Sequence, residues 1–89
     1  MDDILYCKSD DDITEIHLCQ RPRLVVSRSL KEFEACLGGK GFLRVHQSYL
    51  VNLGHVVRYA RHMLVLSNGQ EVPVSRNRRN ALAEAWEHI

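Results

Sequence analysis

No apolar run in this 89-residue sequence approaches the roughly 18–20 residues that a membrane span needs. The N-terminus is acidic, whereas a secretory signal begins with basic residues. The sequence also lacks internal repeats, low-complexity tracts and linkers, so we expect one domain over residues 1–89. These absences favour a soluble, cytoplasmic protein that has no membrane partner.

The sequence has three cysteines, Cys7, Cys19 and Cys36, and none belongs to a C-x-x-C pair. An odd number without pairs argues against a disulfide framework and favours a reducing compartment. We expect each cysteine to behave as a small buried hydrophobic residue.

The net charge of +1 hides a strong asymmetry along the chain. Residues 1–15 contain six acidic residues and one basic residue, which gives this segment a net charge of −5. Residues 21–79 contain eleven basic and three acidic residues, which gives +8. A basic body of this kind favours binding to a polyanion.

The first half of the chain predicts short strands followed by one short helix. The expected strands cover residues 4–7, 13–19 and 24–26, with an acidic turn at residues 10–12. Ser29 and Glu32 form a capping box at the start of a helix. The dipeptide Gly38-Gly39 should end this helix after about two turns.

The second half predicts more strands and then a C-terminal helix. Residues 42–66 are mostly strand-like, and Asn68-Gly69 predicts a hairpin with a type I′ turn, which needs positive φ at both residues. Pro73 cannot donate to a sheet ladder, so its strand should lie at an edge. The apolar stripe of the expected helix consists of Leu82, Ala85, Trp86 and Ile89. The whole pattern predicts a mainly β domain with six or so short strands.

Three arginines, Arg76, Arg78 and Arg79, crowd the expected first turn of this helix, which Ser75 could cap. The helix dipole disfavours each exposed cation there by about 0.3–1 kcal/mol. A bound anion such as a phosphate backbone would compensate, since the first N–H groups of a helix also point at it. The alternative is a solvated basic turn that pairs with Glu71.

A second polar segment follows the strand that begins at residue 42. Strand alternation places Arg44 and His46 on one face, and a continued strand would put Gln47 on the apolar face, where an unbonded polar group costs stability. We therefore expect the pleat to break near residues 46–48 and to expose Gln47 and Ser48. Gln47 is suited to base edges or phosphates, whereas His46 is expected to be a hydrogen-bonded structural residue.

Residues 42–52 (FLRVHQSYLVN) closely resemble the F-x-R-x-H-x-S-x-x-V-N core of LytTR DNA-binding domains. The ending of the same family is similar to residues 67–69 (SNG) and 72–76 (VPVSR). Its opening strand resembles residues 4–6, and its short helix resembles residues 29–33. All the segments occur in order over about residues 4–86, and this ordered set with compatible spacing makes the resemblance specific.

The resemblance implies a β-rich domain of small antiparallel sheets that binds double-stranded DNA through loops rather than a recognition helix. The DNA would bend, so part of the specificity would be indirect. It implies that Arg76 reads guanine in the major groove and that Gln47 lies near the intervening groove, both in base readout. Phosphate contacts are implied for Arg44, Ser48, Asn77, Arg78 and Arg79.

The resemblance also implies the effector domain of a bacterial two-component response regulator that controls transcription. A receiver domain would then belong to the full-length protein, and homodimers would bind promoter repeats. Relatives usually carry a further strand or two at the start, so we expect a domain excised from a longer protein. The acidic turn at residues 10–12 departs from the family, because aspartates repel phosphates, although an aspartate can accept from cytosine N4.

Two other classes of function stay open. An enzyme or metal site would draw on the histidines and cysteines, but His17 and Cys19 share a strand face without a second ligand pair at metal spacing. We therefore expect no enzyme, no cofactor and no metal. A protein-interaction or ligand-sensing module would instead use the edge at Pro73 and the acidic N-terminal segment.

Overall fold

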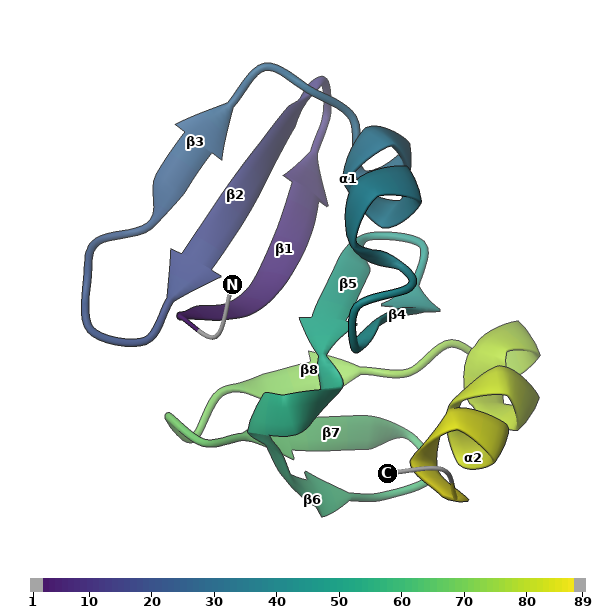
Figure 1. Ribbon diagram of the computed structural model, residues 1–89. Helices are drawn as coiled ribbons and strands as arrows, with labels where there is room; N and C mark the ends of the chain where they lie inside the picture. Colours follow the sequence, from purple (N-terminus) through teal and green to yellow (C-terminus); the bar gives the residue numbers. More distant parts are fainter. Residues whose placement is uncertain (1–2, 88–89) are drawn as a thin grey trace.

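The computed structural model describes residues 3–87 and contains two antiparallel sheets and two helices (Figure 1). The larger sheet consists of β1 (Ile4–Asp10), β2 (Ile13–Leu18), β3 (Leu24–Val26), β4 (Phe42–His46) and β5 (Tyr49–Asn52), in the order β3-β2-β1-β5-β4. The smaller sheet consists of β6 (Val56–Tyr59), β7 (Met63–Leu66) and β8 (Glu71–Pro73), in sequence order. The helices are α1 (Leu30–Leu37) and α2 (Arg79–Glu87), and two 3₁₀ turns are η1 (Leu53–His55) and η2 (Arg76–Arg78).

The predicted fold class is therefore confirmed, with small antiparallel sheets, a short internal helix and a C-terminal helix. Residues 3–87 contain eight strands rather than six or so, because residues 42–66 divide into four. The helices have eight and nine residues, and neither has the length or apolar composition of a membrane span.

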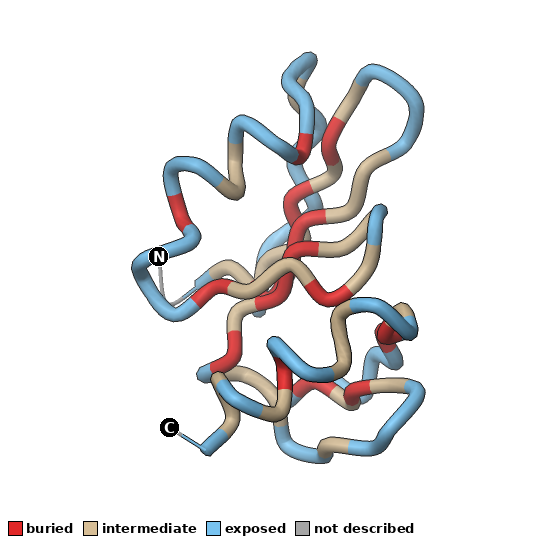
Figure 2. Tube along the Cα trace, turned by 90° about the vertical axis from the view of Figure 1, so that its right-hand side faces the viewer, coloured by how far each residue is buried: buried red, intermediate tan, exposed pale blue. Residues whose placement is uncertain are grey.

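Two apolar clusters hold these elements together. One joins the larger sheet to α1 and consists of Cys7, Ile16, Leu30, Leu37, Phe42 and Leu50. The other joins the larger sheet to the smaller sheet and α2, and its fully buried members include Val45, Val51, Leu64, Leu66, Val72 and Leu82. Buried positions run through the middle of the molecule, whereas exposed positions follow the hairpin ends and outer helix faces (Figure 2).

The capping box at the start of α1 is confirmed at its N-cap, because the Ser29 hydroxyl accepts from the Glu32 backbone N–H at 3.3 Å. The helix ends at Leu37, as the glycines predicted. Gly38 itself has φ −57°, within the right-handed helical region. A Cβ on Gly38 would lie 2.7 Å from the Glu34 carbonyl oxygen, so close approach is the reason for glycine here.

The hairpin at Asn68-Gly69 is confirmed, but the predicted type I′ turn is wrong. Gly69 has φ +89°, whereas Asn68 is not among the residues with positive φ. The Gly69 N–H donates to Leu66 O, and the Leu66 N–H donates to Gln70 O, so the loop has three residues with glycine in the left-handed position. Asn68 contributes differently, since its side-chain oxygen accepts from the Gln70 N–H at 3.0 Å.

Gly69→Ala should lower the free energy of unfolding by about 1 kcal/mol, because an L-residue is strained at this φ. In a domain of this size that corresponds to a fall in Tm of roughly 4–8 °C, measurable by circular dichroism. Gly39→Ala is the matched control, since Gly39 has no positive φ and open space at its Cβ. Equal losses in the two variants would contradict the turn assignment.

Other local predictions have mixed outcomes. Pro73 lies on the edge strand β8, as predicted. The apolar stripe of α2 is confirmed for the buried Leu82 and the partly buried Ala85 and Trp86, whereas Ile89 lies outside the described residues.

The prediction for the cysteines is correct for one of the three. Cys7 is buried, but Cys19 and Cys36 are exposed. The alternation of apolar residues did not reveal that Cys19 follows the end of β2 or that Cys36 lies on the solvent side of α1.

Candidate nucleic-acid interface

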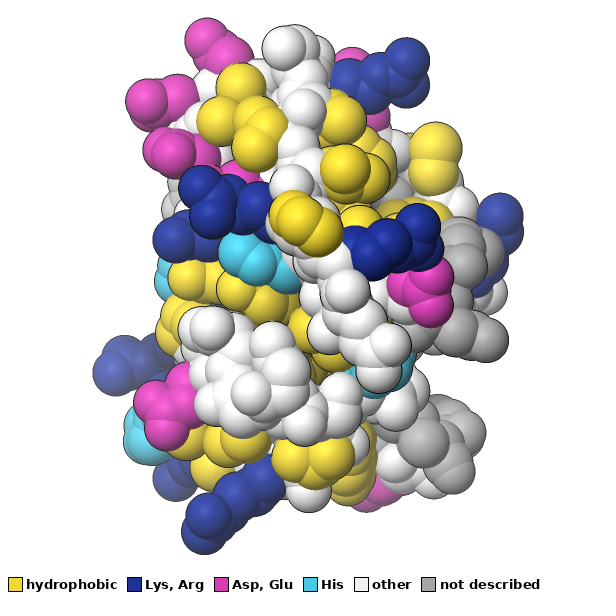
Figure 3. Space-filling model, turned by 90° about the vertical axis from the view of Figure 1, so that its left-hand side faces the viewer, with side chains coloured by type: hydrophobic (Ala, Val, Ile, Leu, Met, Phe, Trp, Pro, Cys, Tyr) yellow, Lys and Arg dark blue, Asp and Glu magenta, His cyan; other side chains and the backbone are white. Residues whose placement is uncertain are grey.

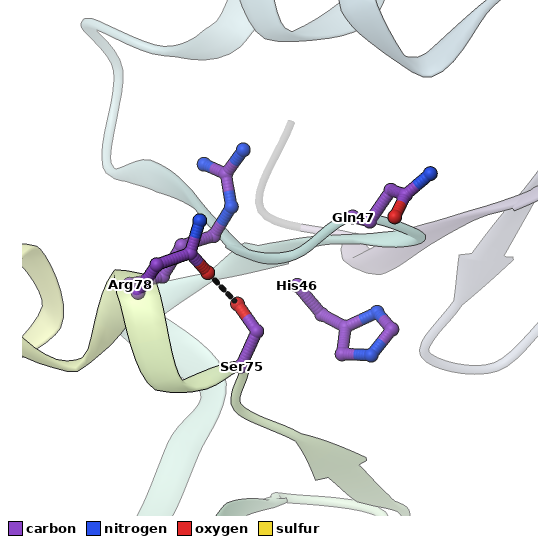
Figure 4. A pocket seen from close by; sticks show the side chains of 5 residues that line it. His46, Gln47, Ser75 and Arg78 are labelled. Carbon is purple, nitrogen blue, oxygen red and sulfur yellow. Dashed lines mark hydrogen bonds between the residues drawn. The ribbon is translucent and has the colours of Figure 1, made fainter.

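The fold brings together two polar segments that lie about thirty residues apart in the sequence. The turn after β4 and the segment that begins at Ser75 line one pocket of about 310 Å³, formed by His46, Gln47, Ser75, Asn77 and Arg78. The Ser75 N–H donates to Val45 O at 2.9 Å and fixes the two backbones against each other. Figure 4 shows Gln47 and Arg78 extending in the same direction from the two rims.

A β-bulge at the end of β4 shapes the first segment. Arg44 pairs with Leu50, but His46 pairs with Tyr49, so β4 carries one extra residue between these pairs. The pleat breaks as predicted and Gln47 is exposed, whereas Ser48 is only partly exposed. The prediction that Arg44 and His46 share a face is wrong, because the bulge turns His46 toward Tyr49 while Arg44 contacts α1.

A ladder of aromatic rings supports this turn from across the larger sheet. His17 stacks on Tyr6 with ring centroids 4.3 Å apart, Tyr6 contacts Tyr49 at 5.9 Å, and Tyr49 contacts His46 at 5.6 Å. Burial is the main cause that raises the pKa of Tyr6, so its ring stays neutral. His46 Nδ1 accepts from the Ser48 N–H at 3.1 Å, which confirms the structural role predicted for His46.

Arg44 links the turn to α1. Its guanidinium donates to Glu34 Oε1 at 3.0 Å, to His46 O at 3.2 Å and to Gln47 O. The Arg44 side chain is only 14% exposed. These contacts make Arg44 a residue that holds the backbone of Gln47 in place.

Arg44→Ala should therefore lower the free energy of unfolding by about 1–3 kcal/mol, because two backbone carbonyls lose a charged donor. The ion pair contributes little of this, since Glu34 is 40% exposed and water screens it. Thermal unfolding without DNA measures the effect. An unchanged or higher Tm would indicate that Arg44 serves only to contact an external anion.

The second segment forms the turn η2 immediately before α2. Ser75 does not cap it through its side chain, but donates from its hydroxyl to Asn77 Oδ1 at 2.9 Å. Arg76 and Asn77 are exposed, and Arg78 and Arg79 are partly buried. Within residues 3–87 no ion pair reaches these arginines, so the pairing with Glu71 considered from the sequence is not found.

Arg79 has a partner that the sequence did not indicate. Its Nη2 lies 2.6 Å from His62 Nδ1, and because a guanidinium only donates, this nitrogen of His62 must accept. The Nε atom of Arg79 is buried and has no hydrogen-bond partner within the described residues. His62 precedes β7, and only the sheet topology places it beside the start of α2.

The start of the molecule borders the same turn. The Ser9 N–H donates to Ser48 O at 2.9 Å, and Lys8 lies 5.9 Å from the centroid of the Tyr49 ring. The acidic residues 10–12 follow Ser9 in the sequence. Among them Asp11 has φ +54°, a conformation that short polar side chains tolerate. Figure 3 shows a group of acidic side chains at the upper left of the left-hand face, and basic side chains together with a few other acidic ones over the rest.

No group of three metal-ligating side chains occurs in the part of the chain that the structure describes. His17 and Cys19, which alternation puts on one strand face, have different partners. His17 bonds Glu15 at 3.0 Å, and this hydrogen bond is the main cause that lowers the pKa of Glu15. Cys19 instead lies near His55.

Comparison with known proteins agrees with this arrangement of a mainly β scaffold and exposed basic loops. The family model of the LytTr DNA-binding domain matches residues 1–87. The chain therefore belongs to the LytTR family of DNA-binding domains, which confirms the resemblance and argues against an enzyme.

A solved structure shares the fold with a TM-score of 0.84 and 26% sequence identity, over 96% of this chain and 82% of that chain. It is described as the LytTr DNA-binding domain of a methyl-accepting/DNA response regulator from Bacillus cereus. A comparison with curated proteins found no match.

Proposed function

We propose that this chain binds double-stranded DNA sequence-specifically, as the effector domain of a bacterial two-component response regulator. The observation that carries the proposal is the meeting of the Gln47 turn and the η2 segment around one pocket. An exposed arginine at residue 76, without an ion pair in the described residues, keeps its donors available for DNA. Two independent segments on one surface can contact a duplex at more than one point.

Base readout is assigned to Arg76 and Gln47, whose side chains are both exposed and carry several polar atoms. An arginine can bind guanine O6 and N7 with two hydrogen bonds. Gln47 extends from the rim of the pocket that faces Arg78 (Figure 4). Its amide both donates and accepts, so it can read a base edge or a phosphate.

Phosphate contacts are assigned to Ser48, Asn77, Arg78 and Arg79. Asn77 Oδ1 already accepts from Ser75, so its amide N–H groups are the part available for DNA. The buried Nε of Arg79 has no hydrogen-bond partner among the described residues, which suggests that this guanidinium is available for a further contact. Arg44 was expected from the sequence to contact phosphate as well, but its three internal contacts favour a positioning role.

The wider setting is part of the same proposal. The full-length protein would carry a receiver domain and act in the cytoplasm, and homodimers would bind repeated promoter sites. The response regulator of Bacillus cereus, whose domain shares this fold, supports that setting.

Selection of bound sequences from random duplex DNA, followed by affinity measurements at several salt concentrations, tests the proposal. We expect one enriched motif and a slope of log K against log salt of about −1.8 per protomer, since the two arginines assigned to phosphates, Arg78 and Arg79, would displace counterions at about −0.9 each. No enriched sequence together with a flat salt response would overturn the proposal and favour a protein-interaction module.

A further inference from the structure

The outer edge of β3 combines an unpaired strand with exposed apolar side chains. β3 ends the larger sheet, and within residues 3–87 no other strand pairs with its outer side (Figure 1). Leu24 and Val25 on this strand are 52% and 54% exposed, and they are two of the three exposed large hydrophobic side chains in the described part of the chain. Such an edge presents free backbone N–H and C=O groups to any strand that approaches.

The other three sheet edges are protected against pairing. At the edge of β4 the Val45 carbonyl accepts from the Ser75 N–H, so the segment that leads into η2 covers this edge. β6 carries a bulge between Val56 and Arg58, and β8 contains Pro73. Bulges, prolines and covering segments are the usual means by which proteins protect their edge strands. β3 has none of these and is protected only by its length of three residues.

The register of β3 places its exposed side chains on both faces of the larger sheet. Val25 lies opposite Glu15, whereas Leu24 lies opposite Ile16, which belongs to the apolar cluster beneath α1. Neighbouring residues of a strand alternate between the faces, so Leu24 and Val25 point in opposite directions. A strand added at this edge would therefore cover apolar surface on both faces and gain backbone hydrogen bonds at the same time.

The two ends of this edge carry opposite charge. The β1–β2 turn at residues 10–12 lies at the end of β3 that leads to Arg28, and these three acidic residues and one basic residue give −2. At the other end Arg21, Arg23 and Asp3 give +1. Figure 3 views the molecule from the side of β3 and shows the acidic group with basic side chains below it. A partner strand of uniform charge would be repelled at one end, whereas an antiparallel copy of β3 presents the opposite charge at each end.

We propose that β3 is the self-association surface of this domain, where it pairs antiparallel with β3 of a second copy. Full overlap of two three-residue strands about a two-fold axis puts Val25 opposite Val25 of the second copy, and Leu24 opposite Val26 of the second copy. The acidic turn of each copy then lies at the end of the other copy that carries Arg21 and Arg23. The pairing joins two five-stranded sheets into one and gives partners to the outer backbone groups of both edges.

Self-association through β3 leaves the candidate nucleic-acid interface open. β3 and β4 are the opposite edges of the larger sheet, and the Gln47 turn follows β4. The inference rests on the proposed function only for its role, as the interface of the homodimer on DNA, and it is tested without DNA, so the two can fail separately. A short edge buries less than the roughly 1,200–2,000 Å² of a standard interface, so we expect a weak dimer with a Kd on the order of 10–100 μM.

Sedimentation equilibrium at protein concentrations from about 10 to 500 μM, which bracket this Kd, should show a monomer–dimer equilibrium. Val25→Lys should weaken dimerisation about tenfold or more, because two like charges would meet at the axis. Val57→Lys is the matched control, since it changes a 65% exposed valine on the edge strand β6, and it should leave the Kd unchanged. A monomer at every concentration, or equal weakening by the two variants, would overturn the proposal.

Disulfide cross-linking tests the register of the pairing. Cys19→Ser and Cys36→Ser first remove the two exposed thiols, and circular dichroism checks that the fold is retained. In this background Val25→Cys should form a covalent dimer under mild oxidation, because directly opposite residues have Cβ atoms about 4.5–5.5 Å apart, close to disulfide geometry. Leu24→Cys should cross-link much less, since the two copies of residue 24 lie diagonally at about 7–8 Å. Equal cross-linking of the two variants would indicate random collision and contradict the pairing.

Discussion

Arg76→Ala should remove most of the preference for the selected DNA site while leaving binding to unrelated duplexes in place. Arg76 is exposed and is not held by an internal ion pair in the described residues, so a guanine can engage its donors fully. A bidentate contact of this kind contributes about 1–3 kcal/mol of discrimination, or roughly 5- to 150-fold in Kd. Fluorescence anisotropy with the selected duplex and a shuffled duplex measures both affinities.

Two further variants separate base readout from charge. Arg79→Ala should weaken the selected and the shuffled duplex alike, because a phosphate contact does not distinguish sequences. Arg58→Ala removes the same charge from an exposed position on the far edge strand of the smaller sheet and should change neither affinity strongly. If Arg76→Ala weakens both duplexes equally, Arg76 is a phosphate contact and the assignment of base readout to it is wrong.

Much of the fold could be predicted because its signals are local. The Ser29 capping box and the edge position of Pro73 depend on backbone groups within a few residues. The buried Leu82 follows from the helical spacing of its apolar neighbours. These patterns need no knowledge of the partner strands.

Two of the wrong predictions concern features that depend on strand pairing. The spacing of residues 42–52 predicted that the pleat would break, but not that β4 carries an extra residue between Arg44 and His46, and this bulge decides the face on which His46 lies. The type I′ turn at Asn68-Gly69 failed because a three-residue loop also satisfies an Asn-Gly sequence between two strands. Register, rather than composition, decides both cases.

The candidate site shows the same division between local and long-range information. The sequence predicted two polar segments, and the fold brings both of them to one pocket. It did not predict that Glu34 neutralises Arg44 or that His62 bonds Arg79, since each partner belongs to another element. The net charge counts every arginine equally. The structure distinguishes them, because Arg44 makes internal contacts whereas Arg76 is exposed.

Leu82→Ala should produce the largest loss of stability among the variants considered. Leu82 is fully buried on α2, in the cluster that joins α2 to both sheets. Removing a buried leucine side chain costs about 2–5 kcal/mol, a large share of the roughly 5–15 kcal/mol that stabilises a domain. Chemical denaturation should show a lower midpoint with an unchanged slope, because the surface exposed on unfolding is nearly the same.

Leu24→Ala is the matched control, since it makes the same chemical change on β3, where the side chain is 52% exposed. It should alter the free energy of unfolding by less than about 0.5 kcal/mol. The helix α2 begins at Arg79 and continues directly from η2, so Leu82 also anchors the segment that carries Arg76. Similar midpoints for the two leucine variants would mean that α2 is not packed on the sheets in solution, and the geometry of the pocket between His46 and Arg78 would lose its support.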